Sequence, residues 1–299
     1  MKRQRVTHNR SLFVLAMLVL LSSTCSPVAA QTIIGSDNFD GTGEYLSRSI
    51  RVDSDGVSTD PGEEAGVFGI FDRNVNAWFA DDSLADPTDE FGVIRSTKTD
   101  SFLAIQNTLE VLESGQTSSV EWTFDVAGFT NLRLSYDMAA MGGFARFDKI
   151  HFFAIPDNGG LIFASRADGF VNVGSFPYTL ENGNTVFLDD PLGFGDQIGN
   201  QFETYGFNLP SGSNTITIIL DTELRREAAV VAIDNLVLTG VPPFVLGDCN
   251  LDGAVTFLDI NPFIQILATD GFLEQADCNQ DGAVNFLDIA FFIAILAAQ

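Results

Sequence analysis

The stretch Ser119-Val-Glu-Trp-Thr-Phe-Asp-Val126 shows most clearly how this chain folds. From Val120 onward its apolar residues occupy every second position, and polar residues occupy the positions between them. Side chains alternate between the two faces of a β-strand, so this spacing predicts a strand with one face in a core and the other toward water. Such half-buried strands are typical of antiparallel sheets.

Similar segments recur along residues 32–240. Asn131-Leu-Arg-Leu-Ser-Tyr-Asp-Met138 repeats the alternation, and turn signals such as Asp157-Asn-Gly-Gly160 separate the segments. Further strands are expected at residues 67–71, 102–111, 149–155, 160–165, 185–189, 202–208, 214–220 and 229–238. No helical pattern of similar length competes, so this mainly β body is predicted to be a β-sandwich of the jelly-roll kind.

The charge of the 299-residue chain excludes two classes of partner. It has 15 Lys and Arg against 40 Asp and Glu, a formal net charge of −25. Nucleic acids and anionic membranes need clustered basic residues, so neither is expected as a partner. Hydrophobic residues make up 45% of the chain, which is enough for a packed core and excludes an acidic disordered tail.

The N-terminal residues 1–30 have the pattern of a secretory signal peptide. Basic residues up to Arg10 precede an apolar run from Leu12 to Leu21, and small residues allow cleavage after Ala30. The alternative is a membrane anchor, but a run of ~10 apolar residues is about half of what crosses a bilayer. No second long apolar stretch follows, so we predict a protein without a transmembrane segment, secreted or held at the cell surface.

The two ends of the body carry a family resemblance. Asp37-Asn-Phe-Asp-Gly41 and Ala232-Ile-Asp-Asn-Leu-Val-Leu-Thr-Gly240 resemble the bracketing strands of lectin-like jelly rolls, the group that contains many carbohydrate-binding modules. A structural calcium often sits near the terminal strands of such modules, so the resemblance implies Asp40 and Asp234 as candidate ligands of one Ca²⁺ ion. The alternative is that both carboxylates only hold loops by hydrogen bonds.

Aromatic residues are the next candidates for carbohydrate binding, because sugar rings stack on aromatic faces. Trp78 lies in a segment without strand alternation and is the candidate platform, whereas Trp122 lies on an apolar face and is predicted to be core. Tyr45, Tyr178 and Tyr205 lie near turns and are further candidates for a groove.

A catalytic body is an alternative to a binding body, but no catalytic residue can be assigned. A glycosidase needs two carboxylates about 5 to 9.5 Å apart, and the body has too many acids to select a pair. Two motifs are absent, the Glu-x-Asp-x-x-Glu of laminarinase-like jelly rolls and the Gly-x-Ser-x-Gly of serine hydrolases. His151 follows Asp148 by three residues, which places the two side chains on opposite faces of a strand.

A repeat begins after the linker, residues 241–246. Residues 247–260 and 276–289 are identical at eleven of fourteen positions, with a period of 29 residues. Each copy has the pattern of a twelve-residue calcium loop, which presents oxygens at positions 1, 3, 5, 7, 9 and 12 and glycine at position 6. The predicted ligands of the first loop are Asp248, Asn250, Asp252, the carbonyl of Ala254, Thr256 and Asp259. Those of the second loop are Asp277, Asn279, Asp281, the carbonyl of Ala283, Asn285 and Asp288.

The repeat also carries a second resemblance. Position 12 is Asp instead of the usual Glu, and no helical pattern precedes either loop. With the tandem spacing, residues 247–299 resemble the type I dockerin, which implies a two-helix module that folds with two Ca²⁺ ions and binds a cohesin-like domain or a cell-surface scaffold. Its contact positions correspond to Phe257 and Leu258, and to Phe286 and Leu287, where large apolar residues replace the usual small polar ones.

The second helix of this module has two apolar stripes. The stripe of Phe286, Ile289, Ile293 and Leu296 is predicted to face the core. Leu287, Phe291 and Ile295 form the other stripe, for which a partner is favoured over the sandwich. The module contains eight acids and no Lys or Arg, so calcium is expected to supply folding energy. Cys249 and Cys278, at position 2 of each loop, form either a disulfide or two buried thiols.

These features predict an exported, polysaccharide-associated protein, in which a carbohydrate-binding sandwich is attached through a calcium-dependent dockerin to a cohesin-type partner or a cell surface. One alternative is a glycoside hydrolase or lyase of polysaccharide catabolism. The other is a non-catalytic envelope or adhesion protein.

Overall fold

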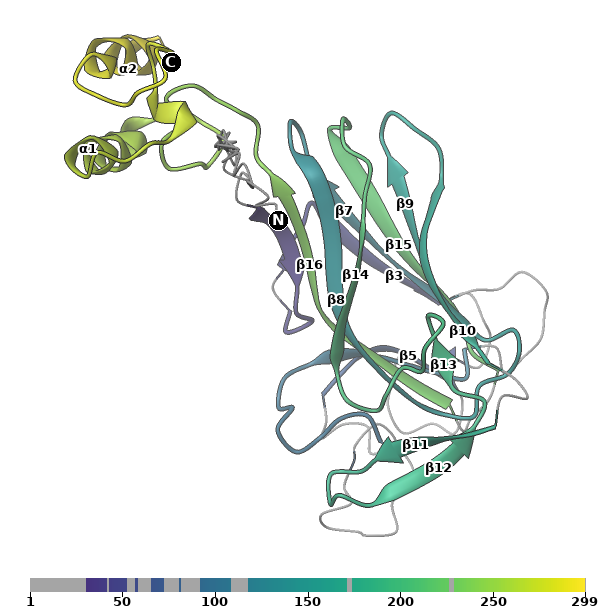
Figure 1. Ribbon diagram of the computed structural model, residues 1–299. Coiled ribbons are helices and arrows are strands. Elements are labelled where there is room, and N and C mark those ends of the chain that lie inside the picture. Colours follow the sequence, from purple (N-terminus) through teal and green to yellow (C-terminus); the bar gives the residue numbers. More distant parts are fainter. Residues whose placement is uncertain are drawn as a thin grey trace, which may run out of the picture. The chain divides into compact units, whose positions relative to one another are not determined.

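The computed structural model describes residues 31–41, 43–52, 57–58, 66–72, 81, 92–108, 118–170, 174–225 and 229–298 (Figure 1). The predicted signal peptide, residues 1–30, and the candidate platform Trp78 lie outside the described residues. Within the described ranges, no helix is both long enough and apolar enough to cross a membrane.

The first sheet has eight strands. Its order is β14-β8-β16-β6-β5-β4, with β1 pairing with β16 and β2 pairing with β1. These strands are β1 (Thr32–Asp37), β2 (Gly43–Glu44), β4 (Val57–Ser58), β5 (Gly66–Phe71), β6 (Phe102–Gln106), β8 (Thr130–Gly142), β14 (Glu203–Asn208) and β16 (Ala229–Val241). Their pairing is antiparallel except between β4 and β5.

The second sheet has six strands in the order β13-β10-β9-β15-β7-β3. These strands are β3 (Ser47–Val52), β7 (Ser118–Asp125), β9 (Lys149–Pro156), β10 (Ile162–Gly169), β13 (Leu192–Gly193) and β15 (Thr215–Glu223). A separate hairpin consists of β11 (Ser175–Thr179) and β12 (Thr185–Asp189). Each of the ten predicted strands has a counterpart, although residues 109–111 of the range 102–111 lie outside the described residues.

The two sheets stack face to face, and their inner faces share one core (Figure 1). Tyr136 on β8 of the first sheet contacts Phe152 on β9 of the second, with ring centroids 4.4 Å apart. On β7, Trp122 is fully buried and its indole Nε1 donates a hydrogen bond to Asp37 Oδ2 at 2.8 Å. The predicted β-sandwich and the core position of Trp122 are therefore confirmed, and the architecture is jelly-roll-like.

The strand β16 closes the body and holds its N-terminal strand. One edge of β16 pairs with β8, and the other edge pairs with β6 through residues 230–233 and with β1 through residues 236–240. The pairing of β16 with β8 is irregular between Asp234 and Val237, and Asn235 has a positive φ of 48°. The irregularity lies where β1 and β6 meet along β16, which is one of the predicted site positions.

The C-terminal segment contains η2 (Phe257–Asp259), α1 (Ile260–Ala268), η3 (Glu274–Ala276) and α2 (Asp288–Ala297). Phe263 of α1 stacks on Phe292 of α2, with ring centroids 4.2 Å apart and ring planes 8° from parallel. A separate hydrophobic cluster surrounds this pair. The segment therefore has a small core of its own, as predicted for a two-helix module.

The predicted core face of the second helix is half right, because Ile289 and Leu296 pack against the module's core as predicted. Phe286 and Ile293 are exposed, and the residue that fills the core is Phe292. The helix begins at Asp288, after Phe286, and most of its residues are apolar. Periodicity cannot select one face of such a helix, and the stacking of Phe292 on Phe263 selects it instead.

Candidate functional site

The first calcium loop folds around its first and last carboxylates. Asp248 accepts hydrogen bonds from the backbone N–H groups of Asp252 (3.2 Å) and Gly253 (2.9 Å). Asp259 accepts one from the backbone N–H of Thr256 at 2.7 Å. Both carboxylates belong to buried residues, so the two ends of the loop are held together inside it.

The second loop repeats these contacts. Asp277 accepts hydrogen bonds from the backbone N–H groups of Asp281 (3.1 Å) and Gly282 (2.8 Å), and Asp288 accepts one from Asn285 (2.8 Å). Each bond has its counterpart 29 residues earlier in the chain. The two loops therefore share one conformation, and the predicted positions 1 and 12 lie in equivalent places in both.

The side chains at loop positions 3 and 5 bend back over the backbone in the same way. Asn250 Oδ1 accepts a hydrogen bond from the Asp252 N–H at 3.0 Å, and Asp252 Oδ1 accepts one from the Ala254 N–H at 3.0 Å. Asn279 and Asp281 make the equivalent bonds in the second loop, at 2.9 and 3.0 Å. These oxygens are thus held at the loop rather than extended into solvent.

Glycine at position 6 is required by the backbone. Gly253 has a φ of 90° and Gly282 a φ of 88°, values that residues with a Cβ atom rarely adopt. Leu251 and Gln280, both at position 4, also have positive φ angles, of 63° and 60°. The same departure at the same position of both copies is the sharp turn that a twelve-residue calcium loop contains.

The donor set of each loop fits Ca²⁺, which prefers carboxylate, amide and carbonyl oxygens. Burial raises the pKa of Asp248, although the backbone hydrogen bonds from Gly253 and Asp252 oppose this rise. Side chains of His, Cys, Asp and Glu alone do not form a metal site anywhere in the described residues.

Both loop cysteines are buried free thiols. Cys249 and Cys278 lie in the hydrophobic cluster around Phe263 and Phe292. Burial raises the pKa of Cys249 to about 12 and that of Cys278 to about 11. Of the two predicted alternatives, the structure has the pair of thiols.

An exposed apolar pair occupies positions 10 and 11 of each loop. The exposed fractions are 81% for Phe257, 69% for Leu258, 80% for Phe286 and 65% for Leu287. The residue before each pair fixes its backbone: Thr256 Oγ1 accepts a hydrogen bond from the Leu258 N–H at 3.2 Å, and Asn285 Oδ1 accepts one from the Leu287 N–H at 2.8 Å. The four predicted contact side chains are therefore presented in two equivalent pairs.

The other two candidates for partner binding differ from each other. Phe291 is about half exposed, as a contact residue should be. Ile295 packs against the hydrophobic cluster of its own module, and its Cγ2 lies near Gly247. The prediction that Ile295 faces a partner is therefore corrected: its side chain belongs mainly to the module's own packing.

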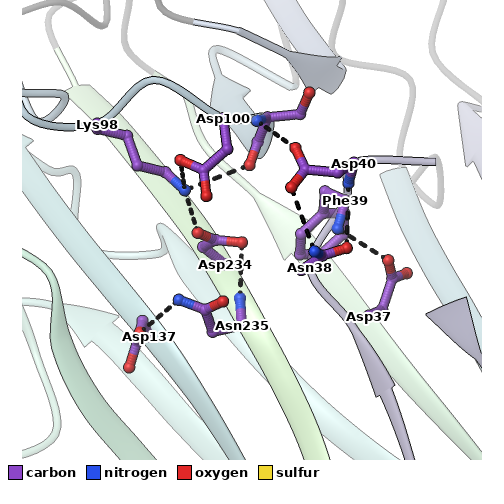
Figure 2. Close-up of polar contacts among 10 residues, drawn as sticks. Asp37, Asn38, Phe39, Asp40, Lys98, Asp100, Asp137, Asp234 and Asn235 are labelled. Atoms are coloured by element: carbon purple, nitrogen blue, oxygen red, sulfur yellow. Dashed lines mark hydrogen bonds and ion pairs between the residues drawn. The ribbon is translucent and has the colours of Figure 1, made fainter. Parts of the chain in front are cut away.

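The structure brings Asp40 and Asp234, the predicted ligands in the sandwich, into neighbouring parts of one polar network (Figure 2). Asp40 accepts a hydrogen bond from the Ser101 N–H at 2.8 Å. Asp234 forms an ion pair with Lys98, whose Nζ also lies 2.7 Å from Asp100 Oδ1 and 3.4 Å from the Ser101 carbonyl oxygen. The cation beside Asp234 is therefore a side chain of the chain itself.

Lys98 is the residue of this network that sequence reasoning missed. Burial alone would lower its pKa, but its hydrogen bonds to Asp100 and Asp234 raise the pKa overall. Burial raises the pKa of Asp234, although Lys98 opposes this rise. Lys98 and Asp234 are 136 positions apart, so no motif spacing connects them.

The candidate aromatic residues for sugar binding have different environments. Trp78 lies outside the described residues, and Tyr178 is buried. Tyr45 is partly buried and lies beneath the Arg48 guanidinium, 5.5 Å from the ring centroid. Tyr205 borders a hollow of about 500 Å³ at the edge of the sandwich.

No protein of curated function matches the chain. Solved structures align with it at low identity. TmCBM61 in complex with beta-1,4-galactotriose has 9% identity and a TM-score of 0.31, covering 65% of this chain and 88% of that chain. The K2 cleaved adhesin domain of Lys-gingipain has 12% identity and a TM-score of 0.34, covering 71% and 99%. The assignment of the sandwich rests on its own sheets and core.

At the other end of the chain, the family model of the dockerin type I domain matches residues 246–297, which confirms the resemblance drawn from the tandem loops.

Proposed function

We propose that this is an exported, polysaccharide-associated protein. Its β-sandwich, residues 32–240, binds carbohydrate, and its dockerin, residues 247–299, attaches it to a cohesin-type partner or a cell-surface scaffold. The signal-peptide pattern of residues 1–30 supports export, and residues 241–246 serve as the linker. The observation that carries the proposal is the duplicated loop, which has the same hydrogen bonds and the same exposed apolar pair in both copies.

Each loop binds one Ca²⁺ ion in this proposal. The ligands are the six predicted residues of each loop, from Asp248 to Asp259 and from Asp277 to Asp288. Three carboxylates per loop give a charge that suits a divalent cation, and the module has no Lys or Arg to neutralise them. Bound calcium supplies the charge balance and the oxygen coordination, while the backbone hydrogen bonds position the oxygens.

The partner binds at the exposed pairs Phe257–Leu258 and Phe286–Leu287. Four large apolar side chains, two in each calcium loop, are exposed to water. Exposed apolar surfaces of this kind mark protein contacts. A cohesin-type partner of this chain therefore offers an apolar contact surface. Because the pairs are equivalent, the same partner can dock in two orientations.

Binding of the full chain to a panel of type I cohesin domains tests this attachment. We expect binding by calorimetry in millimolar calcium and none in EDTA. The double variant Phe257→Ser, Phe286→Ser should bind at least tenfold more weakly, because it removes two aromatic side chains that the partner would bury in the complex. The matched control is Phe272→Ser, since Phe272 is an exposed phenylalanine of the same module. Equal losses in both variants, or binding that survives EDTA, would contradict the proposed surface.

Incubation with insoluble polysaccharides tests the sandwich. Depletion of the full chain from the supernatant, without new reducing ends, is the expected result. New reducing ends would favour the hydrolase or lyase alternative. Failure to bind any polymer would favour the envelope or adhesion alternative and contradict a carbohydrate-binding body.

For the sandwich we propose Lys98 as the resident cation, in place of the third calcium ion that the sequence suggested. Its ammonium contacts Asp100, Asp234 and the Ser101 carbonyl, and its side chain is only 13% exposed. Asp234 is buried and Lys98 already balances its charge, so this part of the network does not need an external ion. Asp40 retains the loop-holding role that was its alternative, through Ser101 and Asn38.

A further inference from the structure

A hollow of about 500 Å³ lies where the edge strands of the two sheets meet. Strand β14 ends the first sheet, and β13 and β10 end the second. Strands β10 and β14 contact each other, so the hollow belongs to the body itself. Its volume is within the range of about 300–1,000 Å³ that is usual for small-molecule sites.

Two aromatic rings form one side of this hollow. A β-bridge between Gly193 and Gln197 closes a tight turn, which includes Gly195 with a φ of 113°. The turn presents Phe194 to Tyr205 of β14, with ring centroids 4.9 Å apart. Phe194 remains 36% exposed, so an aromatic face is accessible at the hollow.

The polar groups of the hollow carry negative charge or none. Asp196, Glu203 and Gln197 line it, and Glu203 Oε2 accepts a hydrogen bond from the Tyr205 hydroxyl at 3.2 Å. No lysine or arginine is among the lining residues that the structure describes. Carboxylates and amides can accept hydrogen bonds from hydroxyl groups, and the carboxylates repel anionic ligands.

A buried hydroxyl lies beneath the hollow, beside Ser165. Tyr136 lines the hollow although it is fully buried, and its phenol oxygen makes no hydrogen bond of good geometry within the described residues. Burial raises the pKa of Tyr136, and the nearby Ser165 only moderates this rise, so the hydroxyl stays protonated and able to donate. Because its oxygen is closed to water, this hydroxyl forms part of the floor of the hollow and is not exposed to a ligand.

A second hollow, of about 540 Å³, lies beside β1 and β16. Its described lining contains Ile33, Asp37, Glu44 and Asn235 but no aromatic side chain. It therefore lacks a ring face for a sugar, and the hollow at β14 is the better candidate.

Resting on the proposed carbohydrate-binding function, we propose that the hollow between β14, β10 and β13 is the glycan site, and that it takes an uncharged pyranose unit. One sugar face stacks on Phe194 and Tyr205, and the sugar hydroxyls bond to Glu203, Asp196 and Gln197. Uronic acids and sulfated sugars are disfavoured, because the charged side chains among the described lining residues, Asp196 and Glu203, are both negative.

Affinity electrophoresis of the full chain tests this site. The soluble probes are a neutral glucan, mannan and galactan, compared with polygalacturonate. We expect retardation by at least one neutral polymer and none by polygalacturonate. Phe194→Ala should weaken this binding about tenfold or more, since it removes the exposed ring. Glu203→Gln should also weaken it, because a neutral amide oxygen accepts hydrogen bonds from sugar hydroxyls less strongly than a carboxylate.

The matched control is Phe163→Ala. Phe163 is 50% exposed on β10, and it belongs to a different aromatic group with His151 and Phe153. Unchanged binding in this control, with losses in the other two variants, supports the site. If the wild-type chain binds a neutral polymer and Phe194→Ala and Glu203→Gln bind it equally well, the site is wrong and the proposed function stands. A wild-type chain that binds polygalacturonate more tightly overturns the ligand class. A chain that binds none of the polymers overturns the proposed function itself.

Discussion

The two acidic regions of this protein balance their charge in opposite ways. In the sandwich, the carboxylates of Asp100 and Asp234 surround Lys98, so the fold contains its own cation (Figure 2). In the C-terminal module, eight acids have no Lys or Arg to pair with. A region with an internal cation can fold without an external ion, whereas one without must take its cation from solution. The comparison predicts that calcium controls one region and leaves the other unchanged.

Intrinsic probes separate the two regions. All four tyrosines lie at or before residue 205, and the only cysteines after Gln31 are Cys249 and Cys278. Tyrosine signals therefore report the sandwich, and thiol signals report the module. The same sample of the chain can test both halves of the comparison.

The largest expected effect is the loss of the module's fold without calcium. Removing calcium with EDTA, or replacing Asp248 and Asp277 by Ala, leaves the remaining carboxylates unbalanced around a small core. We expect the helical signal near 222 nm to fall and to return with calcium only in the wild-type chain. The control is Asp270→Ala, because Asp270 is an exposed acid of the same module outside both loops. A helical signal that is the same in EDTA and in calcium would contradict coupled folding.

Thiol reactivity should show the same switch at single residues. In the chain from Gln31 onward, Cys249 and Cys278 are buried when the module is folded. We expect a thiol reagent to label both slowly in calcium and rapidly in EDTA, because access to buried thiols requires opening of the module. Fast labelling in calcium would mean that the module is open even with the metal, and one unreactive disulfide would mean that the thiols pair in solution.

The next effect in size concerns Lys98. Lys98→Met leaves the carboxylate of Asp234 buried and unpaired, so the free energy of unfolding of the sandwich should fall by about 3 kcal/mol. The matched control is Lys149→Met, since Lys149 pairs with Glu223 and Asp221 at a more exposed position and should cost about 1 kcal/mol or less. Both values come from denaturant unfolding followed by tyrosine and tryptophan fluorescence. Calcium-dependent stability of the wild-type sandwich would show that Lys98 is not its resident cation.

The sequence predicted most strands of the body because the apolar side chains of each strand lie on one face. β7 alternates from Val120 onward, and its range differs from the predicted one by a single residue at each end. Six described strands were not predicted, namely β1, β2, β3, β4, β11 and β13, and two of them show the reason. β3 (Ser47–Val52) contains mainly polar residues and pairs only with β7, and β11 contains Pro177 in the middle of a two-stranded hairpin. Pairing with neighbours holds such strands, and a single sequence does not show the neighbours.

The candidate sites divide in the same way. All the ligands of a calcium loop lie within twelve residues, so fixed spacing makes the set readable from the sequence. The contact between Lys98 and Asp234 depends on the meeting of β1 and β6 along β16, which spacing does not encode. The hollow at β14 depends on the packing of two sheet edges, and of its side chains only Tyr205 was a candidate. Sites whose residues lie close together in the sequence were therefore predictable, and sites whose residues come together only in the fold were not.

The smallest effect concerns the tyrosines of the sandwich in alkali. Burial raises the pKa of Tyr178 to about 12, and the pKa values of Tyr136 and Tyr205 are also raised. An unfolded tyrosine loses its proton near pH 10, so the unfolded state is favoured progressively as the pH rises from 10 toward 12. We expect the absorbance of phenolate at 295 nm to rise mainly above pH 11, with the same midpoint in calcium and in EDTA. The calcium independence follows because every tyrosine lies in the region whose cation is Lys98. A midpoint that moves down when calcium is removed would mean that unfolding of the module loosens the sandwich, and the two regions would then share one stability.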